Sequence, residues 1–325
     1  MRDLLALPKG HLHLHLEGGM RPTTLVELAD AAGIAVPVVT GFGSFTAFAG
    51  MYVAACAVVR GPADLARLVD EAVEDAKLSG AVWFEPSFYA PHHRATFGSD
   101  EAALEIVLDA LHTSAARHGV ACGLMYASDR TEPVDDAVAQ AKIAVRYADQ
   151  GVVSFGLAND EVGRPPEPFA PAYRIIRDAG LLSTPHAGEL VGPDSIRGAI
   201  DALGADRIQH GVRAVEDPAL LARLADEQIC CDVCPTSNVL LSVTPEIASH
   251  QLLAMLEAGV PCSLNGDDPL LFGPGVLEEY ELCRAQLELS DEQLATVARS
   301  SLVHAGAPDS VKAAGLAGID AWLAG

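Results

Sequence analysis

The sequence predicts an α/β fold, a single (β/α)8 TIM barrel with extra helices after strand 1 and at the C-terminus. Short runs rich in Val, Ile, Leu and Cys alternate with amphipathic helical segments, and with a histidine-rich strand near the N-terminus they make about eight strand–helix units. Polar residues suited to catalysis follow several of these strands, where such barrels build their active sites. No linker or change of composition divides the chain, so we expect one domain over residues 1–325.

The composition indicates a globular protein that acts on small molecules. Half of the residues are hydrophobic, and the formal net charge is −23. This charge would repel phosphates, so nucleic acid is not an expected partner. The longest apolar run, Phe45–Val59, is too short to span a bilayer, and residues 1–9 lack a signal-peptide core. We therefore expect a cytoplasmic protein without membrane contact, as a monomer or a small homo-oligomer.

The first expected strand alternates histidine and leucine over His11–Gly18, HLHLHLEG. In a β-strand residues i and i+2 project from the same face, so His13 and His15 lie side by side, whereas a helix would point them roughly 200° apart. Two neighbouring imidazoles at a strand end are typical of half a site for Zn²⁺ or a related ion such as Fe²⁺ or Co²⁺. The alternative is a half-buried strand that merely contains histidines.

A helical region follows this strand before the regular alternation begins. Pro22 and Thr23 open an apolar pattern with steps of three and four, which is typical of a helix start. The run Phe45–Val59 predicts either a lid or wall over the site or ordinary barrel packing. Pro62–Leu78 predicts an acidic amphipathic helix.

From residue 81 the strands and helices alternate. The expected strands are Ala81–Phe88, Val120–Tyr126, Val152–Leu157, Leu181–His186, Arg207–His210, Gln228–Val233 and Val260–Leu264. The expected helices are Asp100–Arg117, Pro133–Ala148, Glu167–Ala179, Pro193–Leu203, Pro218–Ala225 and Glu246–Ala258, followed by a helical tail from Ser290. The strand runs are short and almost continuously apolar, as strands buried on both faces should be.

The seven cysteines do not indicate a disulfide framework. Cys231 and Cys234 match C-x-x-C, but no second such pair completes a zinc site, and the surrounding run Gln228–Val233 is typical of a buried strand. We therefore expect core cysteines.

Further polar residues follow the later strands. His186 and Glu189 occur in the sequence HAGE, His210 in QHG, and Asp267 and Asp268 after the last expected strand. A lone histidine is more often a hydrogen-bonded core or surface residue than a ligand. The carboxyl ends of parallel strands meet at one end of a barrel, however, so these side chains should converge with the histidine strand.

These motifs, in this order, resemble the adenosine deaminase family of the amidohydrolase superfamily. They are His-x-His, His-Ala-Gly-Glu, a His-Gly pair, Cys-Pro-Thr-Ser-Asn and Asn-x-Asp-Asp-Pro, and the resemblance covers Leu7 to about Gly306. It implies that one zinc ion per chain is held by His13, His15, His186 and Asp267.

The resemblance also implies roles for other residues. Glu189 would donate a proton to the purine ring, and His210 would lie beside the water that the metal activates. The implied substrate contacts are Asp268 with the purine ring and Glu17 near the sugar, together with Asn159 and Gly156. Three sites depart from the common family pattern: Glu17 stands where Asp is usual, Asn159 where Gly is usual, and Gly266 where Thr or Ser is usual.

The chemistry of these residues is coherent without the family name. Three imidazoles and one carboxylate leave an open zinc position for water, whose pKa then falls to about 7. Attack at C6 of a purine requires protonation at N1, so Glu189 must be a neutral acid when substrate binds. His210 could orient the attacking oxygen, accept its proton or stabilise the developing charge.

We expect deamination of adenosine or 2′-deoxyadenosine to inosine or 2′-deoxyinosine plus ammonia. Deamination of adenine, aminodeoxyfutalosine or an N6-substituted adenine is the alternative within the same class. A hydrolase of amides or phosphoesters, a non-catalytic purine-binding protein and a nucleic-acid base deaminase are alternatives from other classes. Amide and phosphoester hydrolases of this fold commonly use a lysine that is absent from the fourth strand run. A non-catalytic purine-binding protein would lack Glu189 or a metal ligand. A nucleic-acid base deaminase needs a Pro-Cys-x-x-Cys motif, which is also absent.

Overall fold

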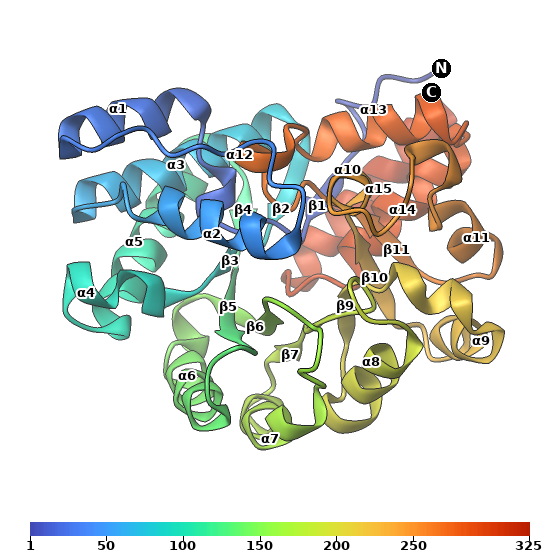
Figure 1. Cartoon of the computed structure of the whole chain (residues 1–325). Helices are drawn as coiled ribbons and strands as arrows, with labels where there is room; N and C mark the ends of the chain where they lie inside the picture. Colours follow the sequence, from blue (N-terminus) through green and yellow to red (C-terminus); the bar gives the residue numbers. More distant parts are fainter.

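Parallel strand pairing carries the chain around a barrel, with helices on the outside (Figure 1). The computed structural model describes residues 1–325. Its strands are β1 (Lys9–His11), β2 (Ala81–Phe84), β3 (Ser87–Phe88), β4 (Ala121–Cys122), β5 (Leu124–Asp129), β6 (Val152–Ala158), β7 (Leu182–Ser183), β8 (His186–Ala187), β9 (Arg207–His210), β10 (Cys230–Val233) and β11 (Cys262–Leu264). Hydrogen bonding orders them as β1–β2–β4, β3–β5–β6–β7 and β8–β9–β10–β11.

Three expected strands each form two short strands. Pro86, Gly123 and Pro185 lie in the breaks between β2 and β3, β4 and β5, and β7 and β8. Proline has no N–H for the strand ladder, and glycine weakens a strand, which explains the interruptions. When each pair is counted as one barrel position, the strands occupy the eight positions of a (β/α)8 barrel.

Backbone hydrogen bonds join the first and last strand segments. His15 N donates to Asp267 O at 2.9 Å, and Asp267 N donates to His13 O at 3.0 Å. Leu14 and Asp267 accordingly form a parallel bridge just beyond β1 and β11. The prediction of a TIM barrel is confirmed, and the same contact brings two parts of the predicted metal site together.

The helices cover the outside of the barrel. They are α1 (Pro22–Ala32), α2 (Phe45–Cys56), α3 (Pro62–Leu78), α4 (Arg94–Phe97), α5 (Asp100–His118), α6 (Val134–Arg146), α7 (Ala170–Asp178), α8 (Pro193–Gly198), α9 (Pro218–Asp226), α10 (Pro235–Leu240), α11 (Leu252–Glu257), α12 (Pro269–Phe272), α13 (Val276–Gln286), α14 (Asp291–Val303) and α15 (Asp309–Ala324). Shorter turns are η1 (Glu17–Gly19), η2 (Ala90–His93), η3 (Ala148–Gln150), η4 (Glu167–Phe169), η5 (Ala199–Leu203), η6 (Val212–Glu216) and η7 (Ile247–Ser249). The extra helices are α1 and α2, which precede α3 between β1 and β2, and α15 at the C-terminus; α3 and α14 pack on the barrel strands themselves. No helix combines the length and apolar character needed to cross a membrane.

Several helical regions differ from the sequence prediction. The expected helix Glu246–Ala258 is shortened to α11, because the His250 imidazole accepts the backbone N–H of Leu252 at 3.1 Å and competes with helical bonding. Helices α4 and α13 were not expected, and neither were the short helices α10 and α12. Pro235 and Pro269 stand at their first positions, a start signal that the sequence does contain.

Apolar side chains fill the interior in two clusters. One includes Leu14, Phe84 and Phe155, and the other includes Leu12 and Ile208. The expected strand over His11–Gly18 is not formed: β1 ends at His11, because the next two N–H groups, of Leu12 and His13, donate to the Asn265 side chain and not to a neighbouring strand. The histidines His11 and His13 are buried as well as the neighbouring leucines, so the segment is not half-buried. The organisation of residues 1–325 as one domain stays a prediction.

Candidate active site

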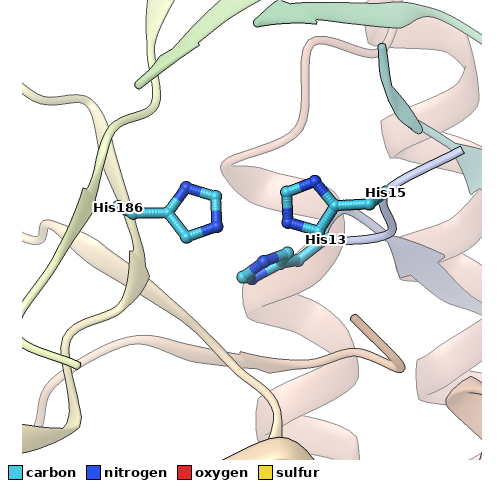
Figure 2. Close-up of side chains that lie close together, drawn as sticks. All are labelled: His13, His15 and His186. Carbon is cyan, nitrogen blue, oxygen red and sulfur yellow. The ribbon is translucent and has the colours of Figure 1, made fainter. Parts of the chain in front are cut away.

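Three imidazoles converge at one end of the barrel, pointing toward one another (Figure 2). The ring centroids lie 4.9 Å apart for His13 and His186, 5.2 Å for His15 and His186, and 5.6 Å for His13 and His15. Asp267 Oδ1 lies 3.2 Å from His13 Nε2 and 3.4 Å from His15 Nε2. The four side chains come from the two ends of the chain and from β8.

The surroundings leave the inward nitrogens of two histidines free to bind a metal. His13 Nδ1 faces the carbonyl of Asp232 at 3.2 Å, and His186 Nδ1 faces that of Leu157 at 3.1 Å. A carbonyl only accepts, so each Nδ1 carries the proton and each Nε2 keeps its lone pair. His13 Nε2 is buried and has no hydrogen-bond partner. Asn265 Oδ1 supports this segment by accepting the N–H groups of Leu12 and His13.

The donor set fits one metal ion and leaves room for a water ligand. Neighbouring ligands at about 2.0–2.1 Å from zinc are about 3–3.5 Å apart in four- or five-coordinate sites, close to the separations of Asp267 from His13 and His15. Imidazole with carboxylate suits zinc and neighbouring transition metals. His13, His15, His186 and Asp267 could therefore hold one such ion.

Three residues around the site adopt the left-handed backbone conformation that is rare outside glycine. They are Asn159, His210 and Asp267, with φ of 79°, 67° and 59°. Each lies at the carboxyl end of a strand or just beyond it. Such strain concentrates at functional sites, where the surrounding structure enforces it.

A buried acid stands beside the metal-ligand cluster. Burial and the negative charge of Asp267 raise the pKa of Glu189 well above its usual range. Its Oε1 lies 3.5 Å from His210 Nε2, which is 3.8 Å from Asp267 Oδ2. Glu189 can therefore remain a proton donor at neutral pH.

Asp268 is a second buried carboxyl group with no partner in the protein. It is 1% exposed, and neither side-chain oxygen has a hydrogen-bond partner. Burial and the adjacent charge of Asp267 raise its pKa well above its usual range. A Cβ on Gly18 would lie 1.8 Å from Asp268 Oδ1, so only glycine allows this close approach.

Metal-ligand candidates and acids line one cavity of roughly 760 Å³, part of it open to solvent. Helix α2 forms an apolar wall through Phe45, Phe48, Ala49, Tyr52 and Val53. The prediction that Phe45–Val59 contributes a pocket wall is thus confirmed. No lysine or arginine lines the cavity, whereas four carboxylic acids do: Asp129, Glu189, Asp267 and Asp268.

Of the remaining implied substrate contacts, Asn159 lines the cavity, whereas Glu17 and Gly156 do not. Asn159 lines the cavity and donates to Asp129 Oδ2 at 2.8 Å. Glu17 does not line it, because the carboxylate is buried and accepts from Tyr52 OH and His93 Nε2, each at 2.6 Å. Gly156 lies inside β6 against Met125 and is also absent from the lining.

Glu161 supports the acid loop, a role that the sequence reasoning missed. Its buried carboxylate accepts the backbone N–H groups of four consecutive residues, 188–191, at 2.7–3.0 Å, and the hydroxyl of Ser195 at 2.6 Å. Arg130, buried 3.9 Å from Glu161 Oε1, also donates to the carbonyl of His186. The only sequence signal is the position of Glu161 just after a strand.

Comparison with known proteins agrees with this geometry. A family profile described as adenosine deaminase matches residues 8–322. This chain belongs to the adenosine deaminase family. It is therefore a hydrolase that acts on a C–N bond of a cyclic amidine.

Individual relatives extend over nearly the whole chain. A putative adenosine/adenine deaminase of Streptomyces virginiae is 45% identical, with 100% of this chain and 99% of the relative covered. The crystal structure of adenine deaminase from Arthrobacter aurescens is 32% identical with a TM-score of 0.91, covering 98% and 100%. An amidohydrolase from Burkholderia ambifaria with bound Zn is 28% identical with a TM-score of 0.89, covering 99% and 93%.

Proposed function

We propose that this chain hydrolyses the 6-amino group of an uncharged adenine-type purine, with one zinc ion bound per chain. The observation that carries the proposal is the meeting of two chemical groups in one cavity. A three-imidazole, one-carboxylate cluster stands beside Glu189, a buried acid whose pKa is raised. Deamination of a purine needs both an activated water and a proton donor to the ring.

His13, His15, His186 and Asp267 would hold the metal. A bound zinc ion lowers the pKa of water to about 7 and so supplies a nucleophile at neutral pH. The zinc in the Burkholderia ambifaria relative supports the choice of metal.

The chain's own residues supply the rest of the chemistry. As the water oxygen bonds to C6, Glu189 delivers its proton to N1, which accepts the electron pair displaced from the ring. Asp268, with two unpartnered oxygens in the cavity, holds the purine edge. The C6–N bond then breaks and the amino group leaves as ammonia, carrying one of the two protons of the water. The other water proton restores Glu189 to its acid form, and the 6-oxopurine keeps the proton on N1. The wall of α2 limits the access of bulk water.

The charge of the cavity supports an uncharged substrate. A phosphate or carboxylate on the 9-substituent would find no lysine or arginine in the lining. It would meet Asp129, which is neither a proposed metal ligand nor one of the two carboxyl groups with a raised pKa. Like charges repel strongly where water is scarce. This disfavours purine nucleotides, including N6-substituted ones, and acidic nucleosides such as aminodeoxyfutalosine.

Glu17 bears on the choice between adenine and adenosine. The sequence places adenosine first and assigns Glu17 to the sugar, but Tyr52 and His93 already occupy both oxygens of this carboxylate. We infer that free adenine is used best. Adenosine is the second candidate, because Asp129 lines the cavity and could accept a hydrogen bond from a sugar hydroxyl.

Turnover of a substrate panel, followed by ammonia release, tests the proposal. Adenine, adenosine, 2′-deoxyadenosine, N6-methyladenine and AMP are compared on protein of measured metal content. We expect adenine to have the highest kcat/KM and AMP to be inactive; preferred use of AMP would refute the charge argument.

The variant Glu189→Gln keeps the size of the side chain but cannot deliver the proton. We expect kcat to fall about 10²–10⁴-fold with metal content unchanged. Near-normal turnover would exclude Glu189 as the acid, and loss of metal would indicate a ligand. His15→Ala should lose the metal, and a metal-free protein with full activity would refute the metal site.

A further inference from the structure

A chain of buried hydrogen bonds runs behind His210, away from the substrate cavity. His210 Nδ1 lies 3.2 Å from Asn238 Nδ2, and Asn238 Oδ1 lies 3.1 Å from His250 Nε2. His250 Nδ1 lies 3.1 Å from the backbone nitrogen of Leu252. Asn238 belongs to α10, and His250 precedes α11. All three side chains are almost fully buried.

The position of every proton in this series of hydrogen bonds follows from the backbone N–H of Leu252, where the series ends. The N–H of Leu252 can only donate, so His250 Nδ1 must accept. Burial lowers the pKa of His250 to about 4, so at neutral pH this imidazole carries one proton, on Nε2. That N–H requires the amide oxygen of Asn238 opposite it. The amide NH₂ then faces His210, whose Nδ1 must accept.

We propose that Asn238 and His250 are positioning residues that hold neutral His210 with its proton on Nε2, so that His210 meets the reacting oxygen as a hydrogen-bond donor. The surroundings of Nε2 agree with this assignment. Glu189 Oε1 lies 3.5 Å and Asp267 Oδ2 3.8 Å from this nitrogen, and the negative charge of Asp267 favours a proton there.

The tautomer of His210 narrows the catalytic role that the sequence left open for this residue. In this tautomer Nε2 has no lone pair, so neutral His210 cannot accept a proton from water there. It can instead stabilise negative charge that develops on the oxygen bonded to C6, as a preorganised donor. This role rests on the proposed deamination, but the tautomer itself does not.

Nitrogen NMR of the zinc-loaded protein, labelled with ¹⁵N-histidine, measures the tautomer directly. Protonated and unprotonated ring nitrogens resonate in separate regions, and the His210 signals are identified by their loss in His210→Gln. We expect His210 in the wild type to have an unprotonated Nδ1 and a protonated Nε2. A protonated Nδ1 would overturn the proposal, whatever the substrate proves to be.

The variant Asn238→Asp tests whether the Asn238 side chain determines the tautomer of His210. A carboxylate at residue 238 only accepts, so His210 Nδ1 must then carry a proton. We expect its nitrogen signal to move to the protonated region and kcat to fall at least about tenfold. An unchanged His210 spectrum would overturn the proposal. If this variant does not fold, Asn238→Leu replaces it; loss of the donor should then give a mixture of tautomers, and an unchanged spectrum counts against the proposal.

A neighbouring variant separates this role from packing. Ser237→Ala removes a buried hydroxyl of the same helix that has no hydrogen-bond partner. We expect it to leave the His210 spectrum and kcat unchanged. Equal effects of Ser237→Ala and Asn238→Asp on both readouts would reduce Asn238 to a packing residue. Absence of purine turnover in the wild type would refute the proposed function alone, because the tautomer can still be measured.

Discussion

Replacing Glu161 by glutamine should loosen the loop that carries the candidate acid. One carboxylate oxygen accepts from Glu189, Leu190 and Val191, and the other accepts from Gly188 and Ser195. A glutamine can keep one oxygen in place, but its NH₂ group must then face at least one backbone N–H. The best arrangement retains three backbone bonds and sets the NH₂ against Gly188.

The cost can be worked from these contacts. A hydrogen bond to a charged group contributes about 1.5–3 kcal/mol, and the bond to Gly188 is lost. Arg130 also loses its buried partner, and breaking a buried pair costs about 3–5 kcal/mol. The two effects overlap, so we expect the free energy of unfolding to fall by about 3–5 kcal/mol. The loosened loop should also displace Glu189 by up to about 1 Å, which should lower kcat about 10–100-fold.

Three measurements on Glu161→Gln test this reasoning: urea unfolding, kcat with the best purine, and hydrogen exchange of amides 188–191. These amides should exchange faster than in the wild type, whereas metal content should hold. The matched control is Ser195→Ala, which keeps the carboxylate and its four backbone bonds. It should cost about 1.5–3 kcal/mol with little effect on kcat. Wild-type kcat and loop protection in Glu161→Gln would refute the anchoring role.

Three further changes have defined outcomes. Gly18→Ala places a Cβ against Asp268 Oδ1 and should raise KM at least about tenfold if Asp268 holds the purine. The control is Gly50→Ala, whose Cβ meets nothing within 4 Å. Equal KM values for the two variants would contradict the contact between Asp268 and the purine. Burial raises the pKa of Glu279 to about 8, above an unfolded value of about 4.3. The folded protein then binds more protons between these values, so stability should fall as the pH rises from about 4 to 8, and Glu279→Gln should flatten that slope in denaturant unfolding; an unchanged slope would exclude Glu279 as its source. Phe48→Ala removes part of the α2 wall and should raise KM several-fold, while an unchanged KM would mean that Phe48 does not contact the purine.

Much of the candidate site could be predicted from local sequence patterns. The alternation in His11–Gly18 predicts that His13 and His15 project to the same side, because an extended chain repeats every two residues. His186 and Asp267 join them because parallel strands end at the same side of a barrel. These rules need only strand period and strand order, both of which the sequence carries.

Other parts of the site depend on packing between distant segments. The Glu17 carboxylate could have faced a sugar, but Tyr52 and His93 approach it from other elements and take both oxygens. Glu161 accepts from a loop 27 to 30 residues further along the chain.

The sequence by itself determined the barrel, the convergence of the candidate metal ligands and the presence of an acid among them, because strand periodicity and turn motifs are local. Only the tertiary structure decided which polar atoms lie free in the cavity and which are already satisfied. The proton on His210 illustrates the reason: it depends on Asn238 and on His250, 40 residues away along the chain, and ultimately on one backbone N–H. Hydrogen-bond partners are chosen by proximity in space, and no sequence pattern of His210 specifies them.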